Sequence, residues 1–288
     1  MIVLLDVGNT RAKLGWRDAR LGREQEAFAI TLREDSQPLS SMSSLIGEWL
    51  SKLPVPALGA CGVSVAKEDV NAELEHILAK FHIPIRWMRP EAQMMGMANR
   101  YDQPSQLGAD RWASLLGVAG KYPHHTRPII LATFGTATTI DTLGPNAVFE
   151  GGMILPGPAL MRASLAAGTA KLPHAQGHGV AFPRNTQQAI STGVLSAQAG
   201  AVWRQCMVVN EAFGLAPLVC VSGGAWPEVE QEVRSMLAQM QIEVVHLPHP
   251  ALDGLARLAE LDDAPSCSSN GNSTDTNTNT GADTGTPR

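Results

Sequence analysis

The sequence predicts an α/β fold made of two halves with a similar order of elements. Short apolar runs alternate with segments whose apolar residues recur at helical spacing. Each half begins with a buried strand, at residues 2–5 and 128–132, that leads into a loop rich in Gly and Thr. Strands and helices that alternate in this way are typical of sheets covered by helices.

In the first half, the uninterrupted apolar run at 2–5 predicts a buried strand, and residues 13–17 and 25–30 could be its antiparallel partners. Further strands are expected at 57–61 and 83–88. Helices are expected at 41–53, 67–81 and 106–118. Apolar residues recur on one face of the last two, at Val70, Leu74, Ile77 and Leu78, and at Leu107, Leu115 and Leu116.

The second half continues the alternation. Strands are expected at 128–132, 137–143, 147–149, 218–221 and 243–247, and helices at 186–213, 228–240 and 251–261. The turn signal Gly144-Pro145-Asn146 separates two of these strands. Residues 172–185, which are rich in Pro, Gly and His, are expected to form a long loop.

Composition limits the classes of function. The chain has 288 residues, of which 44% are hydrophobic, so it can build a substantial core. A formal charge of −5 does not favour binding to nucleic acid or to an anionic membrane, and no apolar run approaches the length of a membrane span. The N-terminus does not match a secretory signal. We therefore expect a cytoplasmic protein.

The expected domains are residues 1–118 and 119–261, followed by a disordered polar tail at 262–288 that lacks large apolar residues. None of the four cysteines forms a CxxC pair, and Cys61, Cys206 and Cys220 lie in apolar stretches. They are expected to be reduced core residues.

Three loops that follow predicted strands carry groups able to bind phosphate. They are residues 6–13, 135–141 and 222–225. Small residues let backbone N–H groups approach phosphate oxygens, Asp6 could hold Mg²⁺, and Lys13 could add a positive charge. Each loop alone could be an ordinary turn or strand. Their occurrence together favours a nucleotide site, although neither GxxxxGK[ST] nor GxGxxG is present.

The stretch YDQPSQLGADRW places Asp110 and Arg111 near the start of a predicted helix. An aspartate there could accept a proton from a substrate hydroxyl, and the arginine could bind an anion. The alternative is a surface ion pair on an amphipathic helix.

The motifs DVGNTRAKLG, YDQPSQLGADRW, FGTATTID, GGMILPG and TAKLP, in this order, resemble the type III pantothenate kinase family over about residues 1–258. The resemblance implies two ribonuclease-H-like domains of the actin-like ATPase (sugar kinase–Hsp70–actin) superfamily, with ATP in the cleft between them. It implies ATP-dependent phosphorylation of pantothenate to 4′-phosphopantothenate, the first step of coenzyme A biosynthesis. It also implies a homodimer that uses Mg²⁺ and a monovalent cation, K⁺ or NH₄⁺.

Position by position, the resemblance implies that Asp110 is the general base and that Asp6 lies near Mg²⁺. It implies ATP contacts for Asp6, Val7, Gly8, Asn9, Thr10, Arg11, Ala12, Lys13 and Thr136, and pantothenate contacts for Tyr101, Gly108, Ala109, Asp110, Arg111 and Thr186. Thr186 is expected to reach across the dimer interface, and residues 152–157 to form a supporting turn.

One position departs from the pattern. Many members of the family carry an aspartate two residues before the GTAT glycine, where it coordinates the monovalent cation. This chain has Thr133 there, and a hydroxyl is a poor replacement for a carboxylate. The cation ligands are therefore left open, with Asp141 as a substitute carboxylate to be examined.

Two other functions compete with a pantothenate kinase. One is a non-catalytic accessory or regulatory factor of the same family, which the presence of Asp6, Lys13 and Asp110 opposes. The other is a different kinase or polyphosphate hydrolase of the superfamily, which would lack the YxxPxxLGxDRW stretch.

Overall fold

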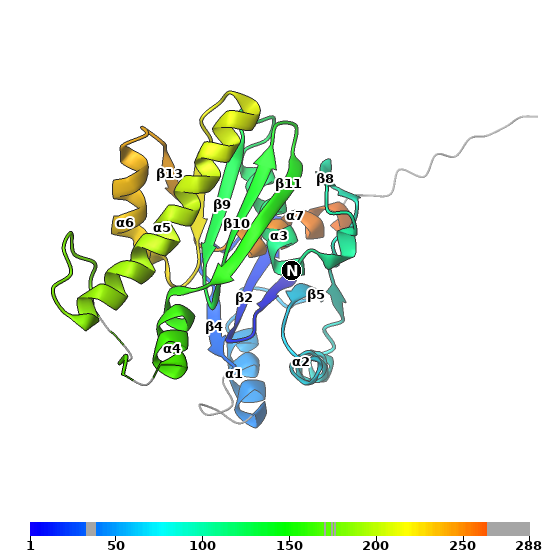
Figure 1. The fold of residues 1–288 in the computed structure, drawn as a ribbon. Helices are drawn as coiled ribbons and strands as arrows, with labels where there is room; N and C mark the ends of the chain where they lie inside the picture. The colour runs from blue at the N-terminus through cyan, green and yellow to red at the C-terminus, as the bar shows by residue number, and fades with distance from the viewer. Residues whose placement is uncertain (33–38, 170, 174, 176, 264–288) are drawn as a thin grey trace, which may run out of the picture.

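The computed structural model describes residues 1–32, 39–169, 171–173, 175 and 177–263, and within them two sheets alternate with layers of helices (Figure 1). One pair of helices covers the outer face of the first sheet, a second pair lies between the sheets, and a third covers the outer face of the second sheet. The layers form because each sheet is apolar on both faces, and each face is buried by amphipathic helices.

The first sheet is mixed. Its strands are β1 (Ile2–Val7), β2 (Arg11–Asp18), β3 (Gly22–Arg23), β4 (Phe28–Thr31), β5 (Gly59–Ser64) and β6 (Ile85–Trp87). The order is β3-β2-β1-β5-β6, with β4 on β2; β1 is antiparallel to β2 and parallel to β5. Helices α1 (Leu39–Ser51) and α2 (Glu68–Lys80) pack on its outer face.

The second sheet has the order β13-β12-β9-β10-β11-β8-β7. Its strands are β7 (Gln93–Met94), β8 (Met97–Asn99), β9 (Ile129–Phe134), β10 (Ala137–Gly144), β11 (Val148–Pro156), β12 (Leu218–Ser222) and β13 (Val244–His246). Helices α5 (Thr186–Phe213) and α6 (Trp226–Ala238) cover its outer face. The short helix α4 (Pro158–Gly168) follows β11 and lies beside the start of α5 (Figure 1).

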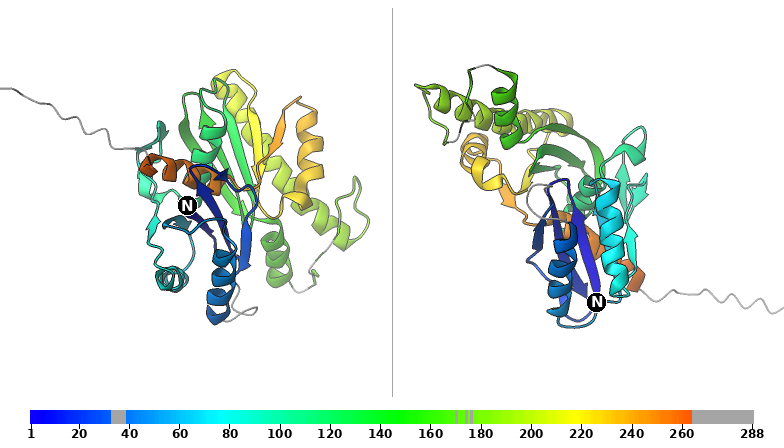
Figure 2. Two further views of the ribbon diagram at one scale, coloured as in Figure 1. Left: turned by 180° about the vertical axis from the view of Figure 1, so that it is seen from behind. Right: turned by 90° about the horizontal axis from the view of Figure 1, so that it is seen from below.

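Helices α3 (Ala109–Lys121) and α7 (Pro250–Asp263) form the layer between the sheets, and Figure 2 shows α7 from behind, lying across the strands. The two helices approach so closely that glycine is required where they touch. A Cβ on Gly254 would lie 1.9 Å from the carbonyl oxygen of Ala113, and one on Gly117 would lie 2.1 Å from that of Pro250. The same core contains Leu4 from the first sheet and Leu131 from the second, so it joins the two halves.

Most expected elements are present, with boundaries shifted by a few residues. Four were not expected, namely β3, β7, β8 and α4. The strands β7 and β8 form a hairpin whose turn has Met95 and Gly96 at positive φ. The supporting turn expected at residues 152–157 is wrong, because this segment continues β11 and pairs with β10 as far as Pro156. The long loop is confirmed for residues 172–173, 175 and 177–185, which contain neither helix nor strand.

The elements cross the expected domain boundaries. Strands β7 and β8 come from the first expected domain but extend the second sheet, and α7 comes from the second but packs against β1 and β5. Helix α7 also takes in residues 262 and 263 of the expected tail, while residues 264–288 lie outside the described part of the chain. Cys61, Cys206 and Cys220 are buried and reduced, as expected.

The contact between α3 and α7 predicts that Gly254→Ala is strongly destabilising. The added methyl would overlap the Ala113 carbonyl, and overpacking of this kind costs about 1–3 kcal/mol or more, which exceeds the gain of about 1 kcal/mol in helix propensity. Urea unfolding followed by circular dichroism measures the change.

Gly200→Ala in α5 is the matched control, because nothing lies within 4 Å of the added Cβ. It should leave stability unchanged or raise it by about 0.5–1 kcal/mol. Equal stability of the two variants would contradict a backbone contact between α3 and α7.

Candidate functional site

Two of the predicted phosphate loops meet across the two sheets. The Oγ1 atoms of Thr10, after β1, and Thr136, after β9, are 2.8 Å apart and share a hydrogen bond. The first loop is also a hairpin, since Gly8 N–H donates to the Arg11 carbonyl at 2.9 Å and Asp6 pairs with Lys13. The hairpin and phosphate-loop readings of this segment are therefore compatible.

The third loop lies next to the other two. Gly223 has a φ of +100°, and a Cβ there would lie 2.1 Å from the carbonyl oxygen of Phe134, which accepts a hydrogen bond from Ala225 N–H at 2.9 Å. A Cβ on Gly224 would lie 3.6 Å from Nη1 of Arg11, so the first loop reaches the third. The three loops thus surround one region between the sheets.

Within the first loop, only some side chains can face a ligand. Val7 and Ala12 are buried in the core under α1 and α2, so their contribution can come only from the main chain. Asn9 and Arg11 are exposed. Lys13 Nζ lies 3.4 Å from Oδ2 of Asp6, and both side chains are partly exposed. An acid and a base at this distance can serve a metal ion and a phosphate together.

The segment before α7 brings a histidine to the same region. Burial, together with the positive charges of Lys13 and Arg23, lowers the pKa of His249 to about 4. His249 is therefore a neutral imidazole near Lys13 at physiological pH. No signal in the sequence pointed to this neighbour, because His249 is far from Lys13 in the chain.

Asp110 lies in the first turn of α3 and is partly buried. Removal from water raises the pKa of its carboxyl, and the nearby charge of Asp6 also raises it, whereas the hydrogen bond from Arg111 N–H to Oδ1 (2.8 Å) lowers it. Gly108 gives the carboxylate its space, since a Cβ there would lie 2.7 Å from Oδ1. A carboxylate with a raised pKa beside a phosphate site can act as a general base.

Arg111 is buried and forms an ion pair with a residue of β10. Its Nε lies 3.1 and 3.2 Å from the two carboxylate oxygens of Asp141, and its Nη2 also donates to Asp141 Oδ1. Burial alone would lower the pKa of Arg111, but its hydrogen bonds and charge interaction with Asp141 outweigh burial and raise the pKa above the usual value. Arg111 is thus held as a fixed cation.

Tyr101 lies on the other side of Arg111. Its Oη accepts a hydrogen bond from Nη1 of Arg111 at 3.1 Å, and its ring packs against Phe149 with centroids 5.3 Å apart. Asn99 fixes the approach to Tyr101, because its Oδ1 accepts from Tyr101 N–H at 3.0 Å and its Nδ2 donates to the Pro104 carbonyl at 3.3 Å. Tyr101, Asp110 and Arg111, which the sequence predicted to act together, are therefore brought together.

The structure bears on which residues could bind the monovalent cation. Asp141 is 1% exposed and both of its oxygens accept from Arg111, so its carboxylate is engaged inside the protein. Thr133 lies on β9 between Thr139 and Ser222 in register, so hydroxyl residues occupy neighbouring positions there. Among the described residues, no three His, Cys, Asp or Glu side chains are grouped to hold a metal ion.

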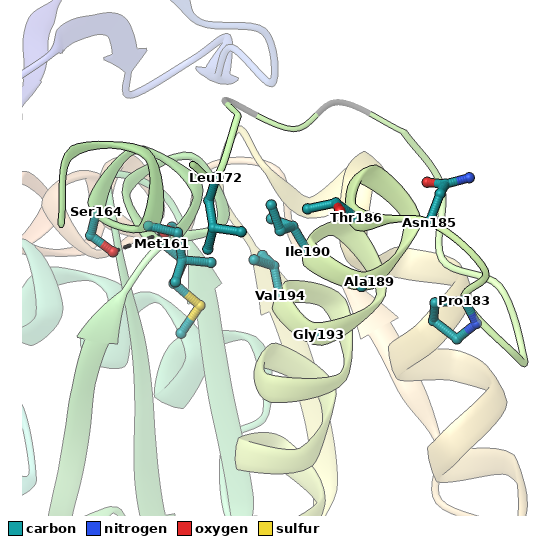
Figure 3. Close-up of a pocket in the computed structure, with 11 residues that line it drawn as sticks. Met161, Ser164, Leu172, Pro183, Asn185, Thr186, Ala189, Ile190, Gly193 and Val194 are labelled. Carbon is teal, nitrogen blue, oxygen red and sulfur yellow. Dashed lines mark hydrogen bonds between the residues drawn. The ribbon is translucent and has the colours of Figure 1, made fainter. Parts of the chain in front are cut away.

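Thr186 lies apart from this region. It is the first residue of α5, which packs on the face of the second sheet opposite to α3. It lines a pocket of about 670 Å³ between α4 and α5, where Met161, Leu172 and Ile190 point toward one another (Figure 3).

A polar network behind the second loop was not predicted. Gln198 of α5 is fully buried; it accepts a hydrogen bond from Thr138 Oγ1 at 2.6 Å and donates to the Pro156 carbonyl at 2.9 Å. Gly157 N–H then donates to the Thr136 carbonyl at 2.9 Å. Gln198 lies between apolar residues of α5, and a buried polar side chain is usually hydrogen-bonded. Its position in the sequence is therefore a signal that could have pointed to its bonds with β10 and β11.

Residues 2–208 match a family model described as type III pantothenate kinase. The type III pantothenate kinase of Bordetella petrii is 45% identical over 272 residues, covering 92% of this chain and all of the relative. Among solved structures, a Campylobacter jejuni protein described as a Baf family transcriptional activator matches with a TM-score of 0.54 at 19% identity, covering 91% of this chain and 98% of that one.

The activator of 2-hydroxyisocaproyl-CoA dehydratase from Clostridium difficile, with bound ADPNP, matches with a TM-score of 0.50 at 12% identity, covering 91% of this chain and 97% of that one. At such identities the likeness concerns the fold, which is the two-domain ribonuclease-H-like fold of the actin-like ATPases. Within the described residues, no helix is both long and apolar enough to cross a membrane.

The raised pKa of Asp110 predicts how its replacement changes stability with pH. The folded chain binds this proton more tightly than the unfolded chain, so the group's contribution to stability is present below the ordinary carboxyl pKa and is lost as the pH rises through the raised value. Asp110→Asn stays neutral and should therefore melt at a higher temperature than the parent at pH 8, but not at about pH 4.

Thermal unfolding at both pH values measures the difference between the two proteins. Asp102→Asn, at an exposed position nearby, is the control and should show no gain at either pH. A gain from Asp110→Asn of the same size at both pH values would contradict the raised pKa.

Proposed function

The chain belongs to the type III pantothenate kinase family, and on that basis we propose how its residues carry out the reaction. The protein phosphorylates pantothenate with ATP to give 4′-phosphopantothenate, the first step of coenzyme A biosynthesis. The observation that carries the assignment of roles is the meeting of the Thr10 and Thr136 loops beside Asp110.

Asp110 takes the proton from the hydroxyl of pantothenate that attacks the γ-phosphate. Its partial burial and the charge of Asp6 support this role, because both raise the pKa of the carboxyl and make it a better base. Tyr101, Gly108, Ala109 and Arg111 surround Asp110 and bind the rest of pantothenate.

The phosphates of ATP lie between the loops that carry Thr10 and Thr136. Backbone N–H groups at the tip of the first loop, at Asn9 and Thr10, the Thr136 hydroxyl and Lys13 stabilise the charge that develops on the phosphate oxygens. Most of the rate enhancement then comes from positioning and electrostatics. Mg²⁺ bound with ATP would neutralise phosphate charge, and the carboxylate of Asp6 would hold it, directly or through water.

The residues of this chain fit a monovalent cation less well. The position expected to supply a carboxylate is Thr133, and Asp141 is engaged by Arg111. We therefore assign K⁺ or NH₄⁺ no ligands and no step in the reaction.

Thr186 contacts pantothenate only if a second copy of the chain supplies it, because α5 and α3 lie on opposite faces of the second sheet. A homodimer through α5 would do this. It is supported by apolar side chains exposed on one stretch of α5 and on neighbouring elements: Ile154 (65%), Leu160, Trp203 (41%), Met207 (41%) and Val208.

We keep the expected division into residues 1–118 and 119–261 with α3 and α7 as the shared layer, and the expected place of the reaction in the cytoplasm, where ATP is available. A non-catalytic accessory role is not favoured. Asp6, Lys13 and Asp110 are all present and lie near one another, and the likeness to the Campylobacter jejuni protein concerns the fold alone.

The function is tested by ADP release on addition of pantothenate, with K⁺, NH₄⁺ and Na⁺ compared. Pantothenate-dependent ADP release is expected. Asp110→Asn should fold and lose at least about 100-fold in turnover, which is the scale of a lost general base. Absence of pantothenate-dependent ADP with every cation would overturn the function, and unchanged turnover of Asp110→Asn would overturn the role of that residue.

The proposed dimer predicts that Trp203→Glu dissociates the protein, because a charge on the exposed face of α5 would be buried without a partner. Sedimentation velocity should show a dimer for the parent and a monomer for the variant, with turnover of pantothenate lost in the monomer.

Leu58→Glu is the matched control, since Leu58 is 74% exposed and lies before β5, away from α5. It should remain a dimer. A parent protein that sediments as a monomer at concentrations where it is active would contradict the proposed interface.

A further inference from the structure

The ion pair with Asp141 uses one edge of the Arg111 guanidinium and leaves Nη1 for another partner. Asp141 accepts from Nε and Nη2, so this edge of Arg111 is used inside the protein. Arg111 is only 6% exposed, and its Nη1 donates to the Oη of Tyr101 at 3.1 Å. Three side chains from α3, β10 and the segment before α3 therefore form one chain of hydrogen bonds.

The direction of these hydrogen bonds follows from the groups involved. A guanidinium has donors and no acceptor, so the oxygen of Tyr101 must accept from Arg111. The proton of the phenol is then directed to another acceptor. Phe149 packs against the ring of Tyr101, and Arg111 lies 5.8 and 5.9 Å from the centroids of the Tyr101 and Phe149 rings, so the position of the phenol is fixed on these sides.

We propose that Asp141 is a positioning residue that, through Arg111, makes Tyr101 a hydrogen-bond donor to an oxygen of pantothenate. This inference rests on the proposed function and extends it to a residue of the second sheet. Asp141 does not touch the substrate. It holds the guanidinium in one orientation and balances its charge, so that Nη1 remains on Tyr101 and Arg111 does not turn to the carboxylate of Asp110 beside it.

Gly152 of β11 lies directly against the ion pair of Arg111 and Asp141. A Cβ on Gly152 would lie 2.1 Å from Oδ1 of Asp141 and 2.6 Å from Nη2 of Arg111. The strand β11 can pass beside β10 at this point only because position 152 has no side chain. Gly152→Ala therefore separates the ion pair without removing either charge.

Steady-state kinetics test the proposal through a pair of variants. Tyr101→Phe alone and Asp141→Asn alone should each raise KM for pantothenate about tenfold, the scale of one hydrogen bond, and leave KM for ATP within about twofold. The double variant should have a KM for pantothenate less than about twofold above that of Asp141→Asn alone. In Asp141→Asn the phenol of Tyr101 already no longer donates to pantothenate, so its removal costs little more. Independent, multiplicative effects of the two changes would overturn the proposal.

Asp253→Asn is the control for loss of an ion pair as such. It removes the carboxylate that lies 2.7 Å from Arg23 Nε, outside the proposed site, and should leave KM for pantothenate unchanged. If Asp141→Asn does not fold, Gly152→Ala takes its place in the kinetic comparison, with the same expected dependence on Tyr101.

A measurement that needs no turnover separates this proposal from the function itself. The chain has only two tyrosines, Tyr101 and Tyr122, so protein labelled with [¹³Cζ]tyrosine gives two resonances, which Tyr122→Phe assigns. The Tyr101 resonance should move in ligand-free Asp141→Asn or Gly152→Ala, and stay in place in Asp253→Asn. A Tyr101 resonance that is unchanged in folded Asp141→Asn or Gly152→Ala overturns the positioning role, whatever the activity.

Addition of pantothenate should shift the Tyr101 resonance in the parent protein and shift it much less in Asp141→Asn. A parent that neither shifts with pantothenate nor releases ADP overturns the proposed function instead, while the ligand-free spectra still decide whether Asp141 controls Tyr101.

Discussion

The contact of α3 with α7 through Gly117 and Gly254 is the constraint on which the rest of the molecule depends. These helices fill the space between the two sheets, and their separation fixes how far apart the sheets lie. Asp110 is carried by the first turn of α3, and the loops with Thr10 and Thr136 are carried by the two sheets. The position of Asp110 relative to these two loops therefore depends on the packing of backbone on backbone in the middle layer.

The site places charged groups out of water, and the surrounding structure offsets part of that cost. Arg111 and Asp141 compensate each other, and the fork of the guanidinium matches the carboxylate. Burial raises the pKa of both carboxyls, Asp110 and Asp141, and Arg111 opposes this for Asp141 through its hydrogen bonds and its charge. In the proposed mechanism, Arg111 stays fixed by Asp141 while the carboxylate of Asp110 takes a proton.

Much of the fold and of the site could be predicted because the signals are local. The apolar run before Asp6 and the periodicity of residues 67–81 report burial directly, and the boundaries of α5 match the expected range because Asn185 caps its start and Gly214, at positive φ, ends it. The grouping of Tyr101, Asp110 and Arg111 was predictable because they share one segment.

What could not be predicted depends on contacts between distant residues. The pairing of Arg111 with Asp141 spans two elements, and the neighbourhood of His249 and Lys13 depends on the order of strands. Residues 152–157 look like a glycine turn, yet residues 152–156 belong to β11. Gly152 serves the close approach of the Arg111–Asp141 ion pair and not a change of direction.

The position of α7 in the chain has a consequence for how the protein is made. Helix α7 packs on the inner face of the first sheet, where Leu4, Cys61 and Val63 are buried, yet about 200 residues separate the end of β5 from the end of α7. At translation rates of about 5–20 residues per second, the inner face of the first sheet stays without α7 for roughly 10–40 s. During synthesis the first sheet therefore presents an apolar surface, and chaperones that bind such surfaces have their best opportunity before α7 leaves the ribosome.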